Sequence, residues 1–333
     1  MSAAEGAVPS LVLAGVLIAA GVAPAQGQSG EILQNYPNKP IRLIIPQSPG
    51  GPSDIIARLT GQKLGENLGH SIVLDNRSGA GGSVGCEIAS KAAPDGYTLL
   101  LGPPGCLTVN PSLYGKLPYD PLRDFEPITQ LTSGPQMLAV HPSVAAHSVK
   151  ELVALAKVKP GQFNYASGGA GSLNHLAFEL FKMVAHLQIV HIPYKGTGPA
   201  SAALVGGQVQ MMMVSLPPGL PHVKAGRLRS LAVTSAQRTR AAPELPTVAE
   251  SGFPGFETVS WHSLLAPAKT PKAIITRLHG ELVKTLAQTD VKERFASLGL
   301  DAVGGTPEEL TQQIKRETAR WAKVIKEAGI KAD

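Results

Sequence analysis

The chain has 333 residues, of which 43% are hydrophobic and 16% are charged, and its formal net charge is +6. This length and composition are typical of a soluble protein with room for two domains, and they exclude a disordered chain. Aromatic residues make up only 5% of the chain and the positive charges are scattered, so no nucleic-acid partner is expected.

The first 25 residues have the features of a signal peptide. Residues 11–22 form an apolar block of the length found in signal-peptide cores, which is too short to span a membrane comfortably. The sequence Ala23-Pro24-Ala25 follows as a small-residue cleavage site. We therefore expect a signal peptide over residues 1–25, cleavage near Ala25 and export of the mature chain.

The segment from Ile41 to Leu64 predicts a strand, a tight loop and the start of a helix. An apolar run over residues 41–45 is followed by a loop rich in Pro and Gly, and Ser53 and Asp54 then open a helical pattern. A helix start presents unpaired N–H groups and a partial positive charge, and glycines let an anion approach the backbone closely. A carboxylate or phosphate could bind there without any Lys or Arg.

The following segments repeat this order. Residues 71–92 predict a strand, a Gly-rich loop at 78–82 and a helix with Ser83 as its N-cap. A further strand is expected at 97–102, and residues 110–127 are expected to form a covering loop. Strands that alternate with helices favour a parallel sheet in an α/β domain.

From residue 128 the alternation begins again, with a third Gly-rich loop at 168–171 between a strand and a helix. The second run follows the same pattern as the first, so it predicts a second α/β lobe. Its strands are expected at 137–140, 163–167, 188–194, 209–215 and 228–234, and its helices at 148–159, 172–185, 199–205 and 221–225.

The end of the chain is predicted to return to the first lobe. Three helices expected between residues 271 and 328 have no sheet of their own, so we expect them to pack on that lobe. The chain then crosses between the lobes twice, near 128–135 and 259–266, and two crossings suit a hinge. We expect lobe 1 to comprise residues 36–132 and 260–333, and lobe 2 to comprise residues 133–259.

The three Gly-rich loops predict a ligand-binding cleft. Ligands of open parallel sheets bind beyond the carboxyl ends of the strands. One such loop usually marks only a tight turn, but three loops in two lobes favour a cleft. His175 could face this cleft or be a buried structural residue, and Lys195 could point into it or pair with a surface acid. Cys86 and Cys106 could form a disulfide, although unpaired buried thiols are favoured.

Familiar catalytic and cofactor motifs do not occur in the sequence. Residues 79–85 lack the spacing of a dinucleotide-binding loop, and the chain contains no phosphate-binding loop, nucleophile elbow or H-E-x-x-H zinc motif. The sequence therefore predicts a binding protein and not an enzyme, with no metal and no cofactor.

Many ordered segments match one family pattern. They include PGGPSD at 49–54, NRSGAGG at 76–82, PDGYTLLLG at 94–102, YASGGAGSLNHLAFELFK at 165–182 and VHIPYKGTGPA at 190–200. In these segments the chain resembles the Bug family, the periplasmic solute receptors of tripartite tricarboxylate transporters. The resemblance covers nearly the whole mature chain.

This resemblance implies a type II periplasmic binding protein fold, in which two α/β lobes joined by a two-crossing hinge close on a ligand in the cleft between them. It implies a small organic carboxylate as ligand, membrane permease subunits as partners, a monomer and a periplasmic location. The alternative is a ligand-sensing periplasmic protein that signals to a sensor kinase.

The resemblance also implies which residues bind the ligand, largely through backbone groups. Many relatives carry an aromatic residue where Gln47 stands and an Asp-Asn type pair where Val214 and Ser215 stand, so the distal side of the pocket departs from the family pattern. The implied ligand-binding residues are Ser48, Gly50, Gly51, Ser53 and Asp54 in lobe 1, with Ser167, Gly168, Ser172, His175, Gly196 and Thr197 in lobe 2.

Overall fold

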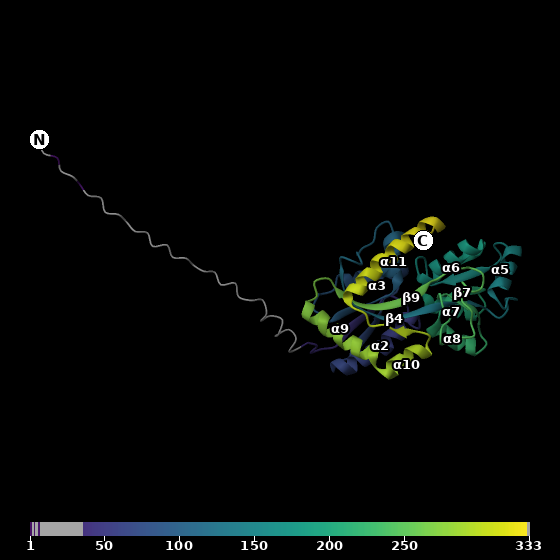
Figure 1. The fold of residues 1–333 in the computed structure, drawn as a ribbon, viewed down its shortest axis with the longest axis horizontal. Coiled ribbons are helices and arrows are strands. Elements are labelled where there is room, and N and C mark those ends of the chain that lie inside the picture. Colours follow the sequence, from purple (N-terminus) through teal and green to yellow (C-terminus); the bar gives the residue numbers. More distant parts are fainter. Residues whose placement is uncertain (2, 4–5, 7–35, 332–333) are drawn as a thin grey trace.

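The computed structural model describes residues 1, 3, 6 and 36–331 of the chain. The expected apolar block of the signal peptide and the cleavage site near Ala25 lie outside the described residues. Within them the fold is a mixed α/β fold built on one continuous sheet (Figure 1), with strand order β2-β1-β3-β9-β4-β7-β5-β6 and with β8 and β10 paired to β4.

The first half of the sheet contains three parallel strands. β1 (Ile41–Ile45) lies between β2 (Ile72–Asn76) and β3 (Thr98–Gly102), and the connections run through α2 (Pro52–Leu68) and α3 (Ser83–Ser90). Side chains alternate between the two faces of a strand. The odd-numbered residues of β1 accordingly pack in one core with α2, whereas Ile44 packs in another with Cys86 of α3.

Two long antiparallel strands join the halves of the molecule. β4 (Phe125–Val140) pairs with β9 (Val259–Pro267) as far as Pro135, and its last residues pair instead with β7 and β8 of the other half. The sequence predicted a strand only from Met137. The strand is longer because β9 supplies hydrogen-bond partners to the preceding residues, so the two expected crossings form one paired ribbon (Figure 1).

The second half of the sheet centres on β5 (Asn164–Ser167). It is parallel to β6 (Val190–Pro193) and to β7 (Met211–Ser215), whose three methionines are fully buried. β8 (Arg229–Val233) pairs with β4 in the antiparallel sense. The helices of this half are α5 (Val149–Val158), α6 (Leu173–Ala185), α7 (Thr197–Val205) and α8 (Leu216–Lys224).

The prediction for α8 was wrong at its start. We expected this helix to begin at Pro221, but it begins at Leu216. Pro217 lies at the start of the helix, where a missing N–H leaves no intrahelical hydrogen bond unmade. Proline is therefore compatible with the start of this helix, which begins five residues earlier than expected.

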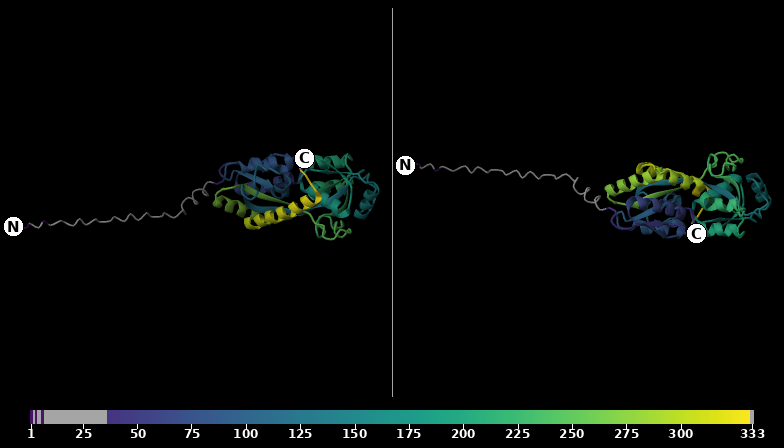
Figure 2. Two further views of the ribbon diagram at one scale, coloured as in Figure 1. Left: turned by 90° about the horizontal axis from the view of Figure 1, so that it is seen from above. Right: turned by 90° about the horizontal axis from the view of Figure 1, so that it is seen from below.

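The C-terminal helices pack on the first half of the molecule, and one of them also reaches the second half. α9 (Lys272–Ala287) packs on α2 and β4, α10 (Thr289–Ser297) packs on α9, and β10 (Asp301–Ala302) pairs with β4. However, α11 (Pro307–Ala328) also contacts α6 of the other half. Figures 1 and 2 show α11 along the side of the molecule, with the C-terminus near the junction of the halves.

Short helical turns occur near the second Gly-rich loop and at the start of the expected covering loop. They are η1 (Ala80–Gly82), η2 (Gly105–Val109) and α4 (Asn110–Leu113). Ser83 is not the N-cap of α3: Gly82 caps it with a φ of 95°, and the Ser83 hydroxyl accepts a hydrogen bond from Asn110. Cys106 lies in η2, and both cysteines are buried and unpaired.

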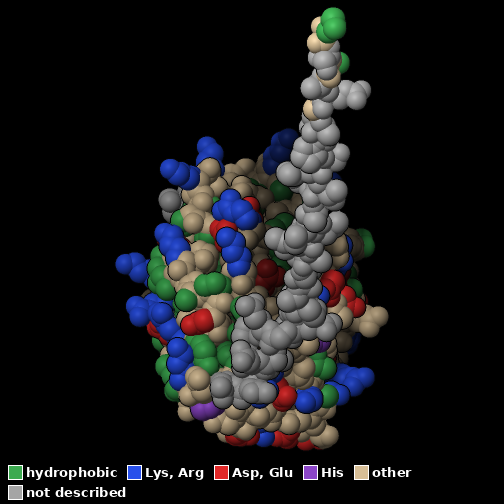
Figure 3. All heavy atoms as spheres, turned by 90° about the vertical axis from the view of Figure 1, so that its left-hand side faces the viewer, with side chains coloured by type: hydrophobic (Ala, Val, Ile, Leu, Met, Phe, Trp, Pro, Cys, Tyr) green, Lys and Arg blue, Asp and Glu red, His purple; other side chains and the backbone are tan. Residues whose placement is uncertain are grey.

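Each half has its own main core. The first is built from residues between 36 and 131 and between 264 and 300, and the second from residues between 138 and 256. The lobe boundaries at 132 and 259 stay a prediction. On the face shown in Figure 3, Lys and Arg side chains are spread among acidic and apolar ones. Among the described residues, no helix has both the length and the apolar character needed to cross a membrane.

Candidate ligand-binding cavity

A cavity of about 590 Å³ lies where the loops after β1, β2, β5 and β6 meet. These loops follow the carboxyl ends of parallel strands, which is where open α/β sheets bind ligands. A second hollow of about 630 Å³ lies over α2 and β2, but it is more open to solvent and has none of the three Gly-rich loops. The lining of the smaller cavity comprises Pro46, Gln47, Ser78 to Gly82, Gly105, Tyr114, Gly168 to Ala170, Ser172 and Pro193 to Thr197.

Part of the predicted ligand-binding set lies in this lining. Gly168, Ser172, Gly196 and Thr197 line the cavity. The other predicted residues are not part of the lining: Ser48, Gly50, Gly51, Ser53, Asp54, Ser167 and His175. The ligand-binding residues predicted from the sequence did not include residues 78–82. The motif NRSGAGG nevertheless marks these residues as the loop of the second strand, loop and helix unit.

The cavity presents backbone amides that have no partner. The amides of Gly79, Ala80, Gly81 and Ala170 donate to no acceptor among the described residues. These amides belong to the loops at 78–82 and 168–171. The two loops lie close together, since a Cβ added to Gly81 would be only 3.0 Å from the Ala170 carbonyl oxygen. Unpaired amides in a cavity favour an anionic ligand.

Three helices begin at the cavity without a side-chain cap. The N-caps of α3, α6 and α7 are Gly82, Ser172 and Gly196, and none of them accepts a hydrogen bond from its helix through a side chain. By contrast, Ser148 and Thr306 cap α5 and α11 through their hydroxyls, away from the cavity. Uncapped N-termini carry a partial positive charge.

Among the described residues, Lys195 is the only charged one in the lining. It is exposed at the edge of the cavity, after β6 and before the N-cap of α7. No carboxylate joins it there among the described lining residues. The whole lining is therefore suited to a ligand with negative charge.

Comparison with known proteins identifies the chain. The model of the tripartite tricarboxylate transporter family receptor matches residues 56–330. The protein belongs to this family. BugT of Bordetella pertussis is 38% identical over 297 residues, which cover 89% of this chain and 91% of BugT.

Solved structures of the family agree with the fold. R. palustris Rpa4515 with adipate is 36% identical to the chain, with a TM-score of 0.88, and the match covers 90% of this chain and 100% of that one. MatC from Rhodopseudomonas palustris with bound malate is 31% identical, with a TM-score of 0.83, and the match covers 87% and 100%. These findings confirm the resemblance to the Bug family and the α/β periplasmic binding fold. They place the chain among solute-binding proteins such as the periplasmic BugD, not among enzymes.

In this family member Asp54 holds the first Gly-rich loop together. Its carboxylate accepts hydrogen bonds from the Gly50 amide at 3.1 Å and from Arg58 Nε at 3.0 Å. Burial alone would raise the pKa of Asp54, but the bonds from Arg58 and Gly50 outweigh it and lower the pKa below its usual value. Ser53 likewise donates to the Gln47 side chain, which lines the cavity.

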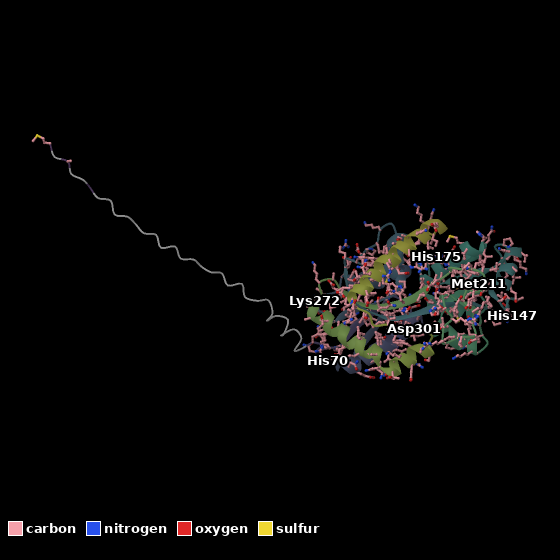
Figure 4. All side chains as sticks on the ribbon, in the orientation of Figure 1. His70, His147, His175, Met211, Lys272 and Asp301 are labelled. Atoms are coloured by element: carbon pink, nitrogen blue, oxygen red, sulfur yellow. The ribbon has the colours of Figure 1, made fainter. Side chains whose placement is uncertain are left out.

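His175 lies under the loop at 168–172. It is 5% exposed, and its Nδ1 accepts a hydrogen bond from the Gly171 amide at 3.2 Å. Burial, His191 and Lys182 together lower the pKa of His175 to about 3. His175 is therefore neutral at physiological pH, and Figure 4 shows it toward the middle of the molecule.

The buried neutral His175 predicts a fall in stability with acidification. Its pKa is about 3 when folded and 6.5 in the reference state, so its contribution is complete above pH 6.5 and is lost as the pH falls toward 3. At pH 5 the loss from this residue should be about 2 kcal/mol. Urea unfolding at pH 7.5 and pH 5.0 measures it.

The control for this prediction is His175→Asn, which cannot titrate. The difference in unfolding free energy between the two pH values should shrink by about 2 kcal/mol in this variant. Buried His262, whose pKa is also lowered to about 3 by burial, should still contribute. Equal pH dependence in both proteins would refute the role of His175.

Proposed function

We propose that this protein captures a small carboxylated organic solute in the cavity and delivers it to the membrane permease subunits of a tripartite tricarboxylate transporter. The observation that carries the proposal is the set of unpartnered amides on two opposed Gly-rich loops. Two family members solved with adipate and malate support a carboxylate.

One carboxylate of the solute would accept hydrogen bonds from the amides of residues 79–81 and from Ala170. Such charge-assisted bonds are stronger than bonds between neutral groups. Lys195 would attract a second negative or polar group at the other end of the cavity. Gln47 also lines the cavity, so its side chain would influence which solute fits.

The predicted ligand-binding residues then divide into two groups. Gly168, Ser172, Gly196 and Thr197 would contact the solute or lie beside it. The others would shape the loops that enclose it: Ser48, Gly50, Gly51, Ser53, Asp54, Ser167 and His175. Gly196 lies against Ser48, and Gly198 lies near the carbonyl oxygen of Pro49, so the loops after β1 and β6 are in contact and would enclose the solute together.

The location and the partners are part of the same proposal. The signal-peptide features of residues 1–25 and the periplasmic location of the relative BugD support export to the periplasm, with cleavage near Ala25. The receptor family supports permease subunits as partners. We propose that the protein acts there as a monomer, which light scattering of the purified mature chain would test.

Titration calorimetry of the purified mature protein tests the proposed ligand class. Adipate, malate and aromatic carboxylates form the panel, and adipamide, which has no charge, serves as the matched control. We expect saturable binding of at least one carboxylate and none of adipamide. The absence of any heat or thermal shift across the panel would contradict the proposal.

Gene deletion separates transport from sensing. If the protein serves a permease, the deletion strain should lose uptake of the radiolabelled ligand. Intact uptake together with loss of ligand-induced transcription would instead identify the sensor-kinase alternative. Complementation with the full chain is the control for either result.

Replacing Asp54 by Ala is expected to weaken binding of the best ligand of the panel about tenfold, because the Gly50 amide loses its buried acceptor. The fold should be retained, as measured by circular dichroism. Asp290→Ala is the control, since Asp290 pairs with Lys63 at an exposed site on α10. Unchanged affinity in the Asp54 variant would show that this loop does not shape the site.

A further inference from the structure

The loop at 168–172 uses nearly all of its amides internally. The Gly168 amide donates to Asn174 Oδ1, the Gly169 amide to Ser167 Oγ, and the Gly171 amide to His175 Nδ1. The Ser172 amide donates to the Gly169 carbonyl oxygen. Ala170 therefore has the one amide of this loop that is left for a ligand.

Two stacked histidines hold the backbone amides on either side of Ala170 in hydrogen bonds, one directly and one through Ser167. The rings of His175 and His191 are stacked, with their centroids 4.1 Å apart and their planes 12° apart. His175 accepts directly from the Gly171 amide. His191 Nε2 lies 2.6 Å from Ser167 Oγ, which in turn accepts from the Gly169 amide.

This histidine pair is fixed from behind by a continuous stack of rings. Tyr165 stacks on His191 at 4.8 Å, and Phe178 stacks on Tyr165 at 4.0 Å. The Tyr165 hydroxyl donates to Glu179, which also pairs with Lys182. The orientation of both imidazoles is thus set by the core of the second half and not by solvent.

We propose that the stacked pair His175–His191 positions the loop at 168–172, so that the Ala170 amide is presented to the anionic group of the ligand. This inference rests on the proposed function of the cavity. His175 and His191 are positioning residues here, since neither lines the cavity.

The chemistry of imidazole explains why histidine occupies position 175. A neutral ring that accepts at Nδ1 carries its hydrogen on Nε2. It can therefore accept from the Gly171 amide and stack on His191 at once. Phe could stack but could not accept, and Asn could accept near the Nδ1 position but could not stack. These two substitutions separate the two roles of the side chain.

Binding of adipate to three proteins tests the proposal. His175→Phe keeps the stack and leaves the Gly171 amide buried without an acceptor, so adipate should bind at least about tenfold more weakly. His175→Asn restores an acceptor but loses the stack, so its affinity should lie between those of the wild type and of His175→Phe. If the Phe variant binds normally and the Asn variant loses affinity, the ring acts only through packing and the proposal is wrong.

A second measurement does not depend on the ligand. In ¹⁵N NMR spectra of the wild type, His175 should show the Nε2–H tautomer, and the Gly171 amide should exchange with solvent more slowly than the Ala170 amide. In His175→Phe the Gly171 amide should exchange at least about tenfold faster. An Nδ1–H tautomer, or equal exchange of the two amides, would overturn the inference.

The two measurements distinguish the possible failures. If the wild type binds no carboxylate of the panel but the tautomer and the exchange rates are as expected, the proposed function fails while the positioning of the loop stands. If the wild type binds adipate and His175→Phe binds it equally well, the function stands and the positioning inference fails.

Discussion

Replacement of Gly198 by Ala should weaken ligand binding by about 10- to 100-fold without destabilising the fold. Gly198 lies in the first turn of α7 and does not need a positive φ. Ala is a better helix former than Gly, so the second half of the molecule should fold at least as well. The added Cβ, however, would lie 2.9 Å from the Pro49 carbonyl oxygen, which belongs to the loop after β1.

This clash would hinder the contact between the two halves of the molecule, but not the folding of either half. A backbone carbonyl cannot move aside as a flexible side chain can, so the loops after β1 and β6 would have to separate. Titration calorimetry gives the affinity, and urea unfolding without ligand gives the stability. Gly280→Ala is the matched control, since Gly280 is a helical glycine in α9 with no atom near its added Cβ. Normal affinity in Gly198→Ala would show that binding does not require this approach.

Trp321→Ala should lower the free energy of unfolding by about 3–5 kcal/mol. Trp321 is fully buried on α11. It packs in a cluster that joins Val109 of η2 and Leu113 of α4 to Leu173 and Leu176 of α6. Truncation would leave a large cavity where the two halves and the C-terminal helix meet, and the surrounding side chains cannot fill it.

Two substitutions on the same helix control this prediction. Trp321→Phe should lose much less stability, because it keeps most of the buried apolar surface. Lys323→Ala, at an exposed position, should change the free energy by no more than about 0.5 kcal/mol. Since Leu173 begins α6 directly after the cavity loop, Trp321→Ala should also weaken ligand binding. A loss of stability below about 1 kcal/mol would show that α11 does not join the halves.

Local patterns in the sequence predicted most of the elements. The apolar runs of β1, β3 and β7 and the capping residue of α5 are signals within a few residues of each other, so they can be interpreted without the fold. The same holds for the Gly-rich loops, whose motifs also carried the resemblance to the family. The predicted element bounds were wrong where a segment distant in the sequence provides the hydrogen-bond partners. β4, for example, is longer than predicted because β9 pairs with it.

The sequence by itself determined the alternation of strands and helices, the three Gly-rich loops and the family. It did so because these features depend on neighbouring residues and on motifs of fixed order. Only the tertiary structure decided which loops meet at the cavity, which amides remain unpartnered and that α11 touches both halves. Those outcomes depend on contacts between residues far apart in the chain, such as Gly81 with Ala170 and Trp321 with Leu176. Asp54 thus holds its loop from outside the cavity lining, whereas residues 78–82, which the predicted ligand-binding set left out, belong to that lining.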